Sequence, residues 1–464
     1  MAHFALTLKL DQKDRRLVYQ TENSLMFWED SGELVDLSSL LQRYQKQIWH
    51  GVSAISPSEP GVKSRDLEII KIQLGFACNM ACKYCSQNNL RAHTAGKDKN
   101  GERVRSFLEK MPQWFSGGKG KDGEGVKVEF WGGESLLYWQ EIVVLAEKIR
   151  ERYPKIQLGV ITNGTLIKEE MVDFALKQRL HFVISHDGPG FQEARGRDPL
   201  QQPVSRENIR RLFLALNPHG LVSFNATITS RNYSLRKIRA HIAQSLAVPE
   251  NEVLLTMDLM TPYDQTGMRY VIADGEEGRH LQQEVFHELA TLGPQDLHLG
   301  QLAKRLRQFF ASIAGSQPLS SVGQMCEMDL PSSLAVDLSG NVLTCQNTTA
   351  LGGHRIGQVD RLEEVRLTSS HHWSRRKECP QCPVVHLCRG SCMFLEGDLW
   401  QSACQQHFHW NAILLAVALY HLTGGILTRI EGENIRGKDG VRRIELIQPE
   451  PFLQRLQEFQ STLR

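Results

Sequence analysis

Runs of apolar residues with strand-like and helix-like spacing alternate from residue 67 to about residue 315. Runs rich in β-branched and aromatic residues predict strands. They lie at 67–75, 126–131, 158–162, 182–185, 222–228 and 253–257. Helical spacing of apolar residues lies between them, at 136–152, 166–178, 208–216 and 235–246. Six strands alternating with helices predict a parallel sheet with right-handed crossovers, so we expect an α/β fold with an open, partial (β/α)6 barrel.

The segments on either side of this barrel have other patterns. Alternation at 4–10, a polar turn at 11–15 and a second apolar run at 17–20 predict a hairpin, and 38–44 reads as a short capped helix. Residues 277–315 have helical character. A second hairpin is predicted from strands at 334–338 and 342–345, and an apolar helix at 412–420, too short to span a bilayer.

The composition narrows the class of protein. With 464 residues, the chain has room for about three domains of roughly 150 residues each. The 54 Lys and Arg residues nearly balance the 52 Asp and Glu residues, which gives no electrostatic case for nucleic acid. No apolar run approaches the roughly eighteen residues of a membrane span, and the N-terminus lacks a signal-peptide pattern. We therefore expect a soluble, cytoplasmic protein with no membrane association.

Three cysteines directly follow the first barrel strand, at Cys78, Cys82 and Cys85. Ten cysteines in a chain without a secretion signal indicate metal or redox chemistry and not disulfides. A [4Fe-4S] cube binds four thiolates, so three ligands leave one iron open for a small molecule. Structural zinc is the alternative, but zinc sites usually need a second cysteine pair, and none follows within the next hundred residues.

Seven further cysteines lie between residues 326 and 404. Five of them fall within 26 residues, which is more than the four ligands of a tetrahedral zinc site. Seven thiols suit two clusters, one with four ligands and one with three. The seven are Cys326, Cys345, Cys379, Cys382, Cys388, Cys392 and Cys404.

Polar motifs follow three barrel strands, at the end of the barrel where chemistry is expected. Trp131-Gly132-Gly133-Glu134 follows the second strand; its glycines allow close backbone approach, and its carboxylate can accept hydrogen bonds from an ammonium group. The alternative interpretation of this motif is a tight turn between strand and helix, with Glu134 in solvent at the start of the helix. Thr162-Asn163-Gly164-Thr165 follows the third strand and also caps the next helix. Ser185-His186-Asp187-Gly188-Pro189 follows the fourth, and on the fifth Asn225 and Thr227 share a face.

The spacing Cys-x3-Cys-x2-Cys resembles the signature of the radical S-adenosylmethionine (radical SAM) superfamily. The resemblance implies that Cys78, Cys82 and Cys85 hold a [4Fe-4S] cluster that binds and cleaves S-adenosylmethionine. The 5′-deoxyadenosyl radical then abstracts a substrate hydrogen. It also implies cofactor contacts from Tyr84, Gly132, Gly133, Glu134, Asn163, Ser185, Asp187 and an arginine, either Arg195 or Arg197.

The later cysteines resemble the SPASM extension of radical SAM enzymes that modify peptides and proteins. The matching features are Cys-x18-Cys ending in Gly-x4-Cys, then Cys-x2-Cys-x5-Cys-x3-Cys and a last Cys. The resemblance implies two auxiliary [4Fe-4S] clusters, and three clusters in all. Cys379, Cys382, Cys388 and Cys404 would hold the distal one. Cys326, Cys345 and Cys392 would hold the proximal one, with an open iron or a fourth ligand such as His354 or a substrate residue.

These observations give four expected domains. They are an N-terminal module at 1–66, a radical SAM barrel at 67–315, a SPASM domain at 316–410 and a helical tail at 411–464. The N-terminal hairpin and helix resemble peptide-recognition modules, but a simple barrel extension fits equally well. The first hypothesis is an oxidoreductase that matures a ribosomally synthesised precursor peptide. It would remove two hydrogens to form a thioether, carbon-carbon or carbon-oxygen crosslink, with flavodoxin or ferredoxin as electron donor.

Three alternatives remain. A sulfatase maturase oxidises Cys or Ser to formylglycine, and related enzymes carry an acidic residue directly after the Gly-x4-Cys turn. Gln346 occupies that position here and cannot take a proton, although Asp337 or Glu327 could substitute. The second alternative is a small-molecule dehydrogenase of the same superfamily. The third is a non-enzymatic, cluster-bearing scaffold, which leaves Glu134 and Ser185 unexplained.

Overall fold

The computed structural model describes residues 2–10, 13–37, 48–91, 101–118, 122–272, 274–291 and 300–454. The chain forms two compact units. The barrel unit consists of Ile55–Tyr270 and Cys326–Ser370. The terminal unit consists of Met1–Ala54, Val271–Met325 and His371–Arg464. Each unit is therefore assembled from segments that are far apart in the sequence.

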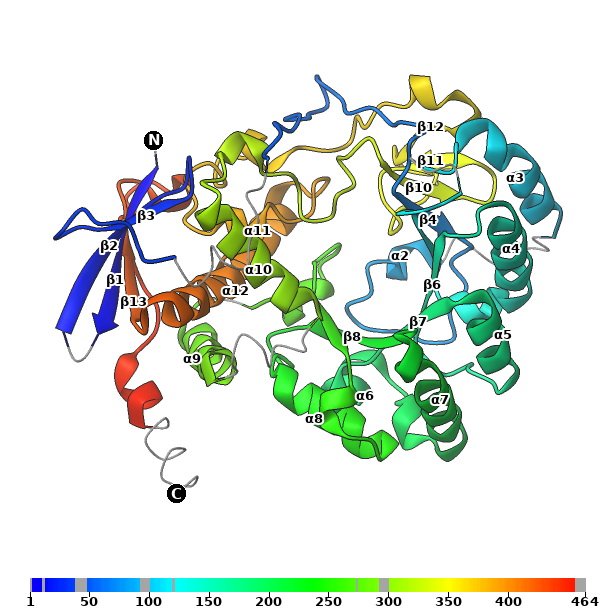
Figure 1. Cartoon of the computed structure of the whole chain (residues 1–464), viewed down its shortest axis with the longest axis horizontal. Helices are drawn as coiled ribbons and strands as arrows, with labels where there is room; N and C mark the ends of the chain where they lie inside the picture. Colours follow the sequence, from blue (N-terminus) through cyan, green and yellow to red (C-terminus); the bar gives the residue numbers. More distant parts are fainter. Residues whose placement is uncertain are drawn as a thin grey trace. The chain divides into compact units, whose positions relative to one another are not determined.

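Six parallel strands in the order β4-β5-β6-β7-β8-β9 form the centre of the barrel unit (Figure 1). The predicted strands are confirmed to within two residues at each end. Their bounds are Ile69–Gln73 for β4, Lys127–Trp131 for β5, Gln157–Thr162 for β6, Leu180–Ser185 for β7, Val222–Ile228 for β8 and Leu255–Leu259 for β9.

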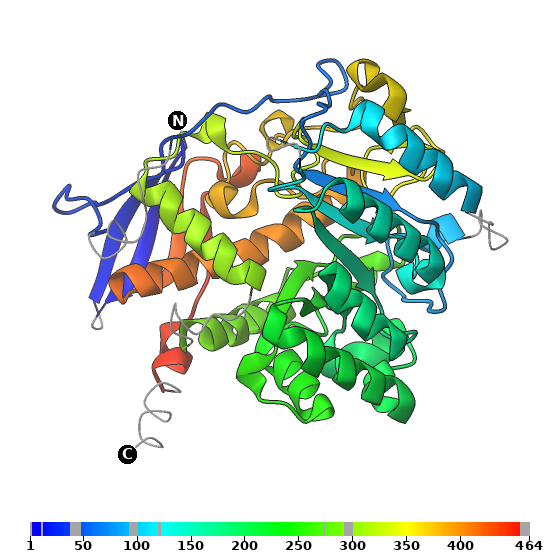
Figure 2. The same ribbon diagram turned by 45° about the vertical axis from the view of Figure 1, so that its right-hand side comes forward.

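Helices cover the outer face of this sheet (Figures 1 and 2). The alternation along β7 shows why: Leu180, Phe182 and Ile184 are fully buried, whereas the residues between them are partly exposed on the other face. The predicted helices are confirmed, with an earlier start for α7 and later starts for α4 and α5. Their bounds are Trp139–Arg152 for α4, Glu170–Gln178 for α5, Pro203–Leu216 for α7 and Leu235–Leu246 for α8. The periodicity did not predict α3 (Gly101–Trp114) or the short α2 (Asn88–Arg91) and α6 (Phe191–Arg195).

The second predicted hairpin is confirmed, and it extends the barrel sheet. Strand β10 (Ser333–Asp337) pairs in parallel with β4, and β11 (Asn341–Leu343) and β12 (Arg355–Gln358) follow antiparallel. Within the described residues, the sheet has nine strands in the order β12-β11-β10-β4-β5-β6-β7-β8-β9. The hairpin that leads to Cys345 is thus a direct neighbour of the strand that leads to Cys78.

The terminal unit contains a five-stranded antiparallel sheet in the order β14-β13-β1-β2-β3. Its bounds are His3–Leu10 for β1, Lys13–Gln20 for β2, Leu25–Trp28 for β3, Ile426–Glu431 for β13 and Arg443–Glu445 for β14. The predicted N-terminal hairpin is confirmed, but β2 begins at Lys13 and not at Leu17. The pairing Ala5↔Glu431 joins the two ends of the chain, and Figure 1 shows the blue and red strands side by side. The expected helix at 38–44 lies outside the described residues.

In the described residues, the terminal unit also contains α9 (Glu276–Thr291), α10 (Gly300–Ala314), α11 (Val385–Cys388) and α12 (Gly397–Thr423). The predicted apolar helix at 412–420 is the last part of α12, which has 27 residues. Where a helical tail was expected, the chain also contributes β13 and β14. None of the helices in the described residues is long and apolar enough to cross a membrane.

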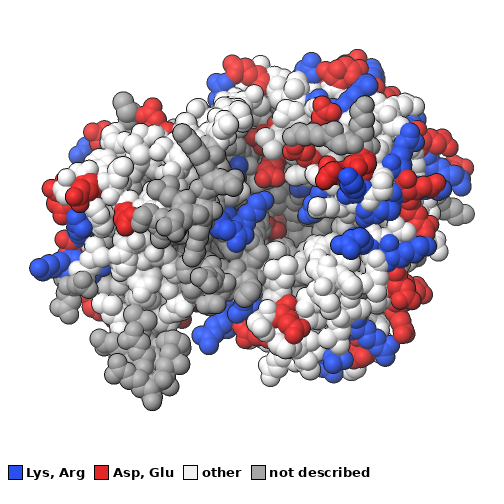
Figure 3. All heavy atoms as spheres, viewed as in Figure 1, with Lys and Arg blue, Asp and Glu red and all other residues white. Residues whose placement is uncertain are grey.

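Charges of both signs share the visible surface of the barrel unit. On this face, Lys and Arg residues are interspersed with Asp and Glu residues (Figure 3), in line with the near balance of 54 basic and 52 acidic side chains in the whole chain. The described part of this face therefore presents no large field of one sign.

Candidate active site and auxiliary cysteine sites

Cys78, Cys82 and Cys85 lie on the loop that follows the C-terminal end of β4. Cys82 is buried with Met80 and Phe191, and Cys78 and Cys85 pack against this cluster. Burial raises the pKa of Cys82 to about 11, against the opposing charge of Arg195. Metal binding would have to remove that proton, and thiol deprotonation accompanies cluster assembly. The structure thus brings the three predicted thiols together on one loop.

Gly132 and Gly133 hold the turn after β5 against this cysteine loop. A Cβ atom on Gly132 would lie 2.6 Å from the Gly75 carbonyl oxygen, and one on Gly133 would lie 2.4 Å from the Ala77 oxygen. Because neither residue has a Cβ atom, Gly133 N can donate to Gly75 O at 2.9 Å, and Glu134 N to Ala77 O at 2.8 Å. The two glycines therefore allow the turn after β5 to lie directly against the backbone at the start of the cysteine loop.

The Glu134 carboxylate is buried and accepts three hydrogen bonds from the protein. Oε1 accepts from Leu136 N at 2.9 Å and from Thr162 Oγ1 at 2.7 Å, and Oε2 accepts from Asn163 N at 2.7 Å. Burial raises the pKa of Glu134, and these hydrogen bonds oppose that shift. The carboxylate therefore connects the turns after β5 and β6, and Oε2, which accepts only one of the three bonds, keeps a lone pair for a further donor.

Asn163 connects the turn after β6 to the cysteine loop. Its Nδ2 donates to Asn79 Oδ1 at 2.9 Å, and Asn79 Nδ2 donates to Thr165 Oγ1 at 2.8 Å. Asn79 lies directly after Cys78, so two turns expected at the cofactor site meet the loop that carries the thiols.

Asp187, Arg195 and Tyr84 form a network beside the cysteines. Arg195 donates from Nε to Asp187 Oδ2 at 2.8 Å and from Nη2 to Oδ1 at 3.0 Å. Tyr84 donates its hydroxyl to Asp187 Oδ2, and Thr227 N donates to Oδ1 at 2.9 Å. Burial alone would raise the pKa of Asp187, but Arg195 and these donors shift it below its usual value. The carboxylate is therefore held ionised.

The two arginines that the sequence left open have different surroundings. Arg195 has a side chain that is only 10% exposed, and its Nη2 also donates to Thr227 Oγ1 at 3.1 Å. Arg197 is exposed and donates to Gln202. Of the two, Arg195 is the one that the structure connects to the cysteine loop. Ser185 is half-buried at the end of β7, in register with Asn225.

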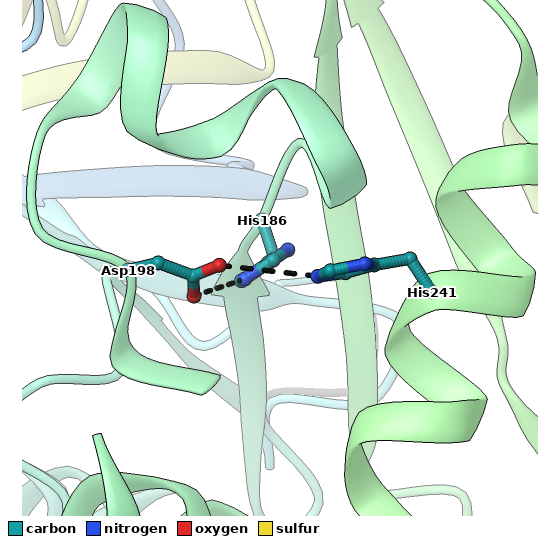
Figure 4. A group of neighbouring side chains, drawn as sticks. All are labelled: His186, Asp198 and His241. Carbon is teal, nitrogen blue, oxygen red and sulfur yellow. Dashed lines mark hydrogen bonds and ion pairs between the residues drawn. The ribbon is translucent and has the colours of Figure 1, made fainter. Parts of the chain in front are cut away.

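A second group of polar side chains, His186, Asp198 and His241, lies just after the end of β7, next to α8 (Figure 4). His186 Nε2 lies 2.9 Å from Asp198 Oδ1, and His241 Nε2, from α8, lies 3.8 Å from Asp198 Oδ2. Gly188 N donates to His186 Nδ1 at 3.0 Å. The neutral ring therefore carries its proton on Nε2 and donates it to Asp198. A metal ion at Nε2 would require that nitrogen to lose its proton. These three residues, which the sequence did not predict as a group, therefore fix the 185–189 turn.

Polar residues on the inner face of the sheet were also missed. Lys71 and Gln73 alternate with buried Ile70 and Ile72 on β4, and this alternation was the available signal. Lys71 Nζ donates to Gln346 Oε1 at 3.3 Å, so Gln346 lies over the inner face of β4.

Asn225 and Thr227, the β8 residues predicted to share a face, both have protein partners. Asn225 Nδ2 donates to Asp258 Oδ2 at 3.2 Å, and Thr256 Oγ1 donates to Asn225 Oδ1 at 2.8 Å. Thr227 Oγ1 accepts from Arg195. Thr227 is therefore the one tied to the network beside the cysteines.

Cys326 and Cys345 belong to the barrel unit, and Cys392 belongs to the terminal unit. Burial raises the pKa of Cys345 to about 12, and the charge of nearby Cys326 contributes to the shift. His354 Nδ1 lies 3.2 Å from Thr344 Oγ1. The set of Cys326, Cys345 and Cys392 as ligands of one cluster stays a prediction.

Four cysteines of the terminal unit line one cavity. They are Cys379, Cys382, Cys388 and Cys404, and Glu378, Trp400 and Phe408 share the lining. Burial raises the pKa of all four thiols. Four thiols around one cavity fit the donor set of a [4Fe-4S] cluster. Arg436, which sequence reasoning missed, donates from Nη2 to Cys404 Sγ at 3.1 Å.

Two curated proteins resemble this chain in sequence. One is the radical SAM cyclopropyl synthase TigE of Paramaledivibacter caminithermalis, 21% identical over 269 residues, which cover 53% of this chain and 55% of that protein. The other is the serine-type anaerobic sulfatase-maturating enzyme of Bacteroides thetaiotaomicron, 21% identical over 372 residues, which cover 71% of this chain and 83% of that enzyme. The chain thus spans little more than half the length of the first relative.

Solved structures support the fold. Native anSMEcpe with bound AdoMet superimposes with a TM-score of 0.50 at 16% identity, covering 75% of this chain and 99% of that one. The same enzyme with AdoMet and the Cp18Cys peptide gives 0.50 at 17% identity, with the same coverage. The model of the Radical SAM superfamily matches residues 72–243, the segment that contains the cysteine loop and strands β5 to β8. Residues 72–243 of this chain therefore match a radical SAM domain.

Proposed function

We propose that Cys78, Cys82 and Cys85 hold a [4Fe-4S] cluster at the C-terminal ends of the parallel strands and that S-adenosylmethionine binds beside it. The observation that carries this proposal is the convergence of three thiols with the buried Asp187–Arg195 pair and the Gly132–Gly133 turn. When bound, this cluster and cofactor supply a 5′-deoxyadenosyl radical that abstracts a hydrogen atom from a substrate carbon.

The side chains around the cysteine loop would bind and orient the cofactor. Arg195 uses Nε and Nη2 for Asp187 and Thr227, which leaves Nη1 to donate to a carboxylate. Asp187 holds the guanidinium in place and balances its charge. At the other turn, Glu134 can accept from an ammonium group while its three protein hydrogen bonds keep it fixed. Asn163 and Ser185 complete the proposed contacts.

The substrate that we propose is a precursor peptide. The curated relatives are a cyclopropyl synthase and a sulfatase-maturating enzyme, and anSMEcpe binds a peptide beside AdoMet. One hydrogen atom would leave the peptide to form 5′-deoxyadenosine. A second electron and a proton would leave as the new bond forms, for a net loss of two hydrogens. The seven later cysteines fit two auxiliary clusters that would receive this electron, and flavodoxin or ferredoxin would supply the first one.

Sulfatase maturation is the second candidate, because the match to the sulfatase-maturating relative covers 83% of that enzyme. The residue after Cys345 is Gln346, whose amide cannot accept a proton from the substrate. Asp337 is not a ready substitute: its carboxylate accepts from Ser339 N at 2.9 Å and from Asn341 N and Nδ2 at 3.0 and 2.7 Å. These contacts fix Asp337 in the hairpin turn and weaken its case as the base; Glu327 stays the other possible substitute, so the experiment has to separate the two candidates.

The test is the mass of the peptide encoded beside this gene, co-expressed without oxygen with the enzyme or with its Cys78→Ala variant. We expect loss of hydrogens in pairs that depends on Cys78, and fragmentation would locate the bond. Conversion of Ser to formylglycine also removes two hydrogens, so an aldehyde-reactive hydroxylamine separates the two candidates. An unchanged peptide, with S-adenosylmethionine still cleaved, would contradict the peptide assignment.

A further inference from the structure

Arg436 places a buried guanidinium group against the four-cysteine cavity. The residue is 3% exposed, and its Nη2 lies 3.1 Å from Cys404 Sγ. Its Nη1 donates to Gln405, and its Cζ lies 4.7 Å from the centre of the Phe408 ring. The charge thus reaches the wall of the cavity from the loop between β13 and β14.

The backbone holds this position independently of the side chain. Arg436 has a φ of 60°, in the left-handed region that non-glycine residues seldom adopt. Its N–H donates to Gln381 O at 2.7 Å, within the segment that carries Cys379 and Cys382. A Cβ atom on Gly437 would lie 2.7 Å from the Lys377 carbonyl oxygen, so only glycine permits this approach. The loop is therefore pressed against the cysteine-bearing segment at two successive residues.

Arg436 has no carboxylate among its hydrogen-bond partners in the described residues, although the charges of Asp274 and Glu378 act on it from a longer distance. Within the described residues its guanidinium donates to a thiol and to an amide, and its Nε has no hydrogen-bond partner. Glu378 shares the cavity, but its carboxylate accepts from Trp400 Nε1 at 3.3 Å and Gln401 Nε2 at 2.7 Å. A buried cation is costly unless negative charge lies nearby, and four thiolates around a cluster would supply that charge.

We propose that Arg436 stabilises the reduced form of the distal cluster and so raises its reduction potential. Reduction adds one negative charge to the cluster, and a charge-assisted hydrogen bond to a ligand sulfur favours the more negative state. The inference rests on the proposed binding of a [4Fe-4S] cluster by Cys379, Cys382, Cys388 and Cys404. It makes this cluster the favoured acceptor for the electron that leaves the substrate.

The test is a redox titration of the reconstituted full chain in which Cys78, Cys82 and Cys85 are replaced by Ala, so that only auxiliary clusters contribute. The signal is the electron paramagnetic resonance of the reduced clusters during dithionite reduction. We expect Arg436→Gln to make reduction of one cluster at least tenfold less favourable, a shift of about 59 mV for a one-electron couple. Arg436→Lys keeps the charge but loses the planar fork, so its shift should be smaller.

Arg442→Gln is the matched control, because Arg442 is exposed in the same loop and carries the same charge. Its potentials should equal those of the parent. Equal potentials in Arg436→Gln would overturn the inference and leave the cluster assignment intact. Loss of the distal irons in both Arg436→Gln and Arg436→Lys would also overturn it, in favour of a role in assembly. A parent protein without a four-cysteine cluster would contradict the proposed function itself.

Discussion

Two sets of cysteines in this chain each lie beside a buried arginine, but the charge of that arginine is balanced differently. Beside Cys82, Arg195 forms a two-pronged ion pair with Asp187. Beside Cys404, Arg436 donates directly to the thiol and has no carboxylate among its hydrogen-bond partners in the described residues. A cation that is hydrogen-bonded to a carboxylate adds little net charge to its surroundings, whereas one that is hydrogen-bonded to the thiol itself favours a more negative state of that sulfur.

This difference suits two different tasks. A cluster that must donate an electron to a sulfonium needs a low potential, and the Asp187–Arg195 pair leaves it almost without a net positive neighbour. A cluster that must accept an electron benefits from a positive neighbour, as Arg436 provides. Under these two proposals, the same side chain type would serve cofactor binding at one site and electron acceptance at the other, and the hydrogen-bonded carboxylate would make the difference.

The largest expected effect comes from removing one cysteine set at a time. Replacing Cys78, Cys82 and Cys85 by Ala should abolish S-adenosylmethionine cleavage, and iron should fall from about twelve to about eight per chain at four irons per cluster. Replacing Cys379 and Cys382 should lower iron by a similar amount while cleavage persists. Iron analysis and chromatography of 5′-deoxyadenosine measure both. Cleavage that survives the first replacement would remove the basis for calling that site catalytic.

Asp187→Asn should remove the negative charge that balances Arg195 beside Cys82. It leaves the Arg195 charge buried without its partner, and we expect a loss of about 3–5 kcal/mol in unfolding free energy. The folded-state pKa of Asp187 is below its ordinary value. Its contribution is therefore complete above the ordinary pKa of about 4 and is lost as the pH falls through the lower folded pKa.

Melting temperatures from pH 3 to pH 7 measure this contribution, and the variant should lose part of the dependence at the acid end. Asp173→Asn, at an exposed position on α5, is the control and should keep the parent profile. Identical profiles for Asp187→Asn and the parent would mean that the ion pair does not stabilise the folded state.

Arg195→Gln and Arg197→Gln form a matched pair for the cofactor contact. A charge-assisted hydrogen bond is worth about 1.5–3 kcal/mol, so Arg195→Gln should raise the KM for S-adenosylmethionine roughly tenfold to a hundredfold. Arg197 is exposed, and its replacement should change the KM by less than about twofold. Equal effects would mean that the network around Asp187 does not select the cofactor-binding arginine.

The sequence predicted the parallel sheet well because strands depend on local patterns, whereas the ligand roles of the cysteines stay predictions. The strands have contiguous apolar runs, and Cys78, Cys82 and Cys85 have a fixed spacing. It could not predict the pairing of β10 with β4 or of β1 with β13, because such register depends on segments far apart in the chain. Arg436 was missed for the same reason, since nothing in the local sequence of the tail indicates that Cys404 lies beside it. The choice of Arg195 over Arg197 required the position of Asp187.

Tyr84→Phe is the smallest change that tests the Asp187–Arg195 ion pair beside Cys82. It removes the hydroxyl that donates to Asp187 Oδ2 but keeps the ring, which packs edge-on against Tyr270 at 5.6 Å between centroids. Asp187 would still pair with Arg195, so we expect a loss of only about 1.5 kcal/mol in unfolding free energy and a KM for S-adenosylmethionine within about fivefold of the parent. Tyr270→Phe, on the other side of the same ring contact, is the control for loss of a hydroxyl. If Tyr84→Phe raised the KM as much as Arg195→Gln does, the hydroxyl and not the ion pair would be the principal support of the guanidinium. The balance of charge beside Cys82 would then depend on Tyr84 as much as on Asp187.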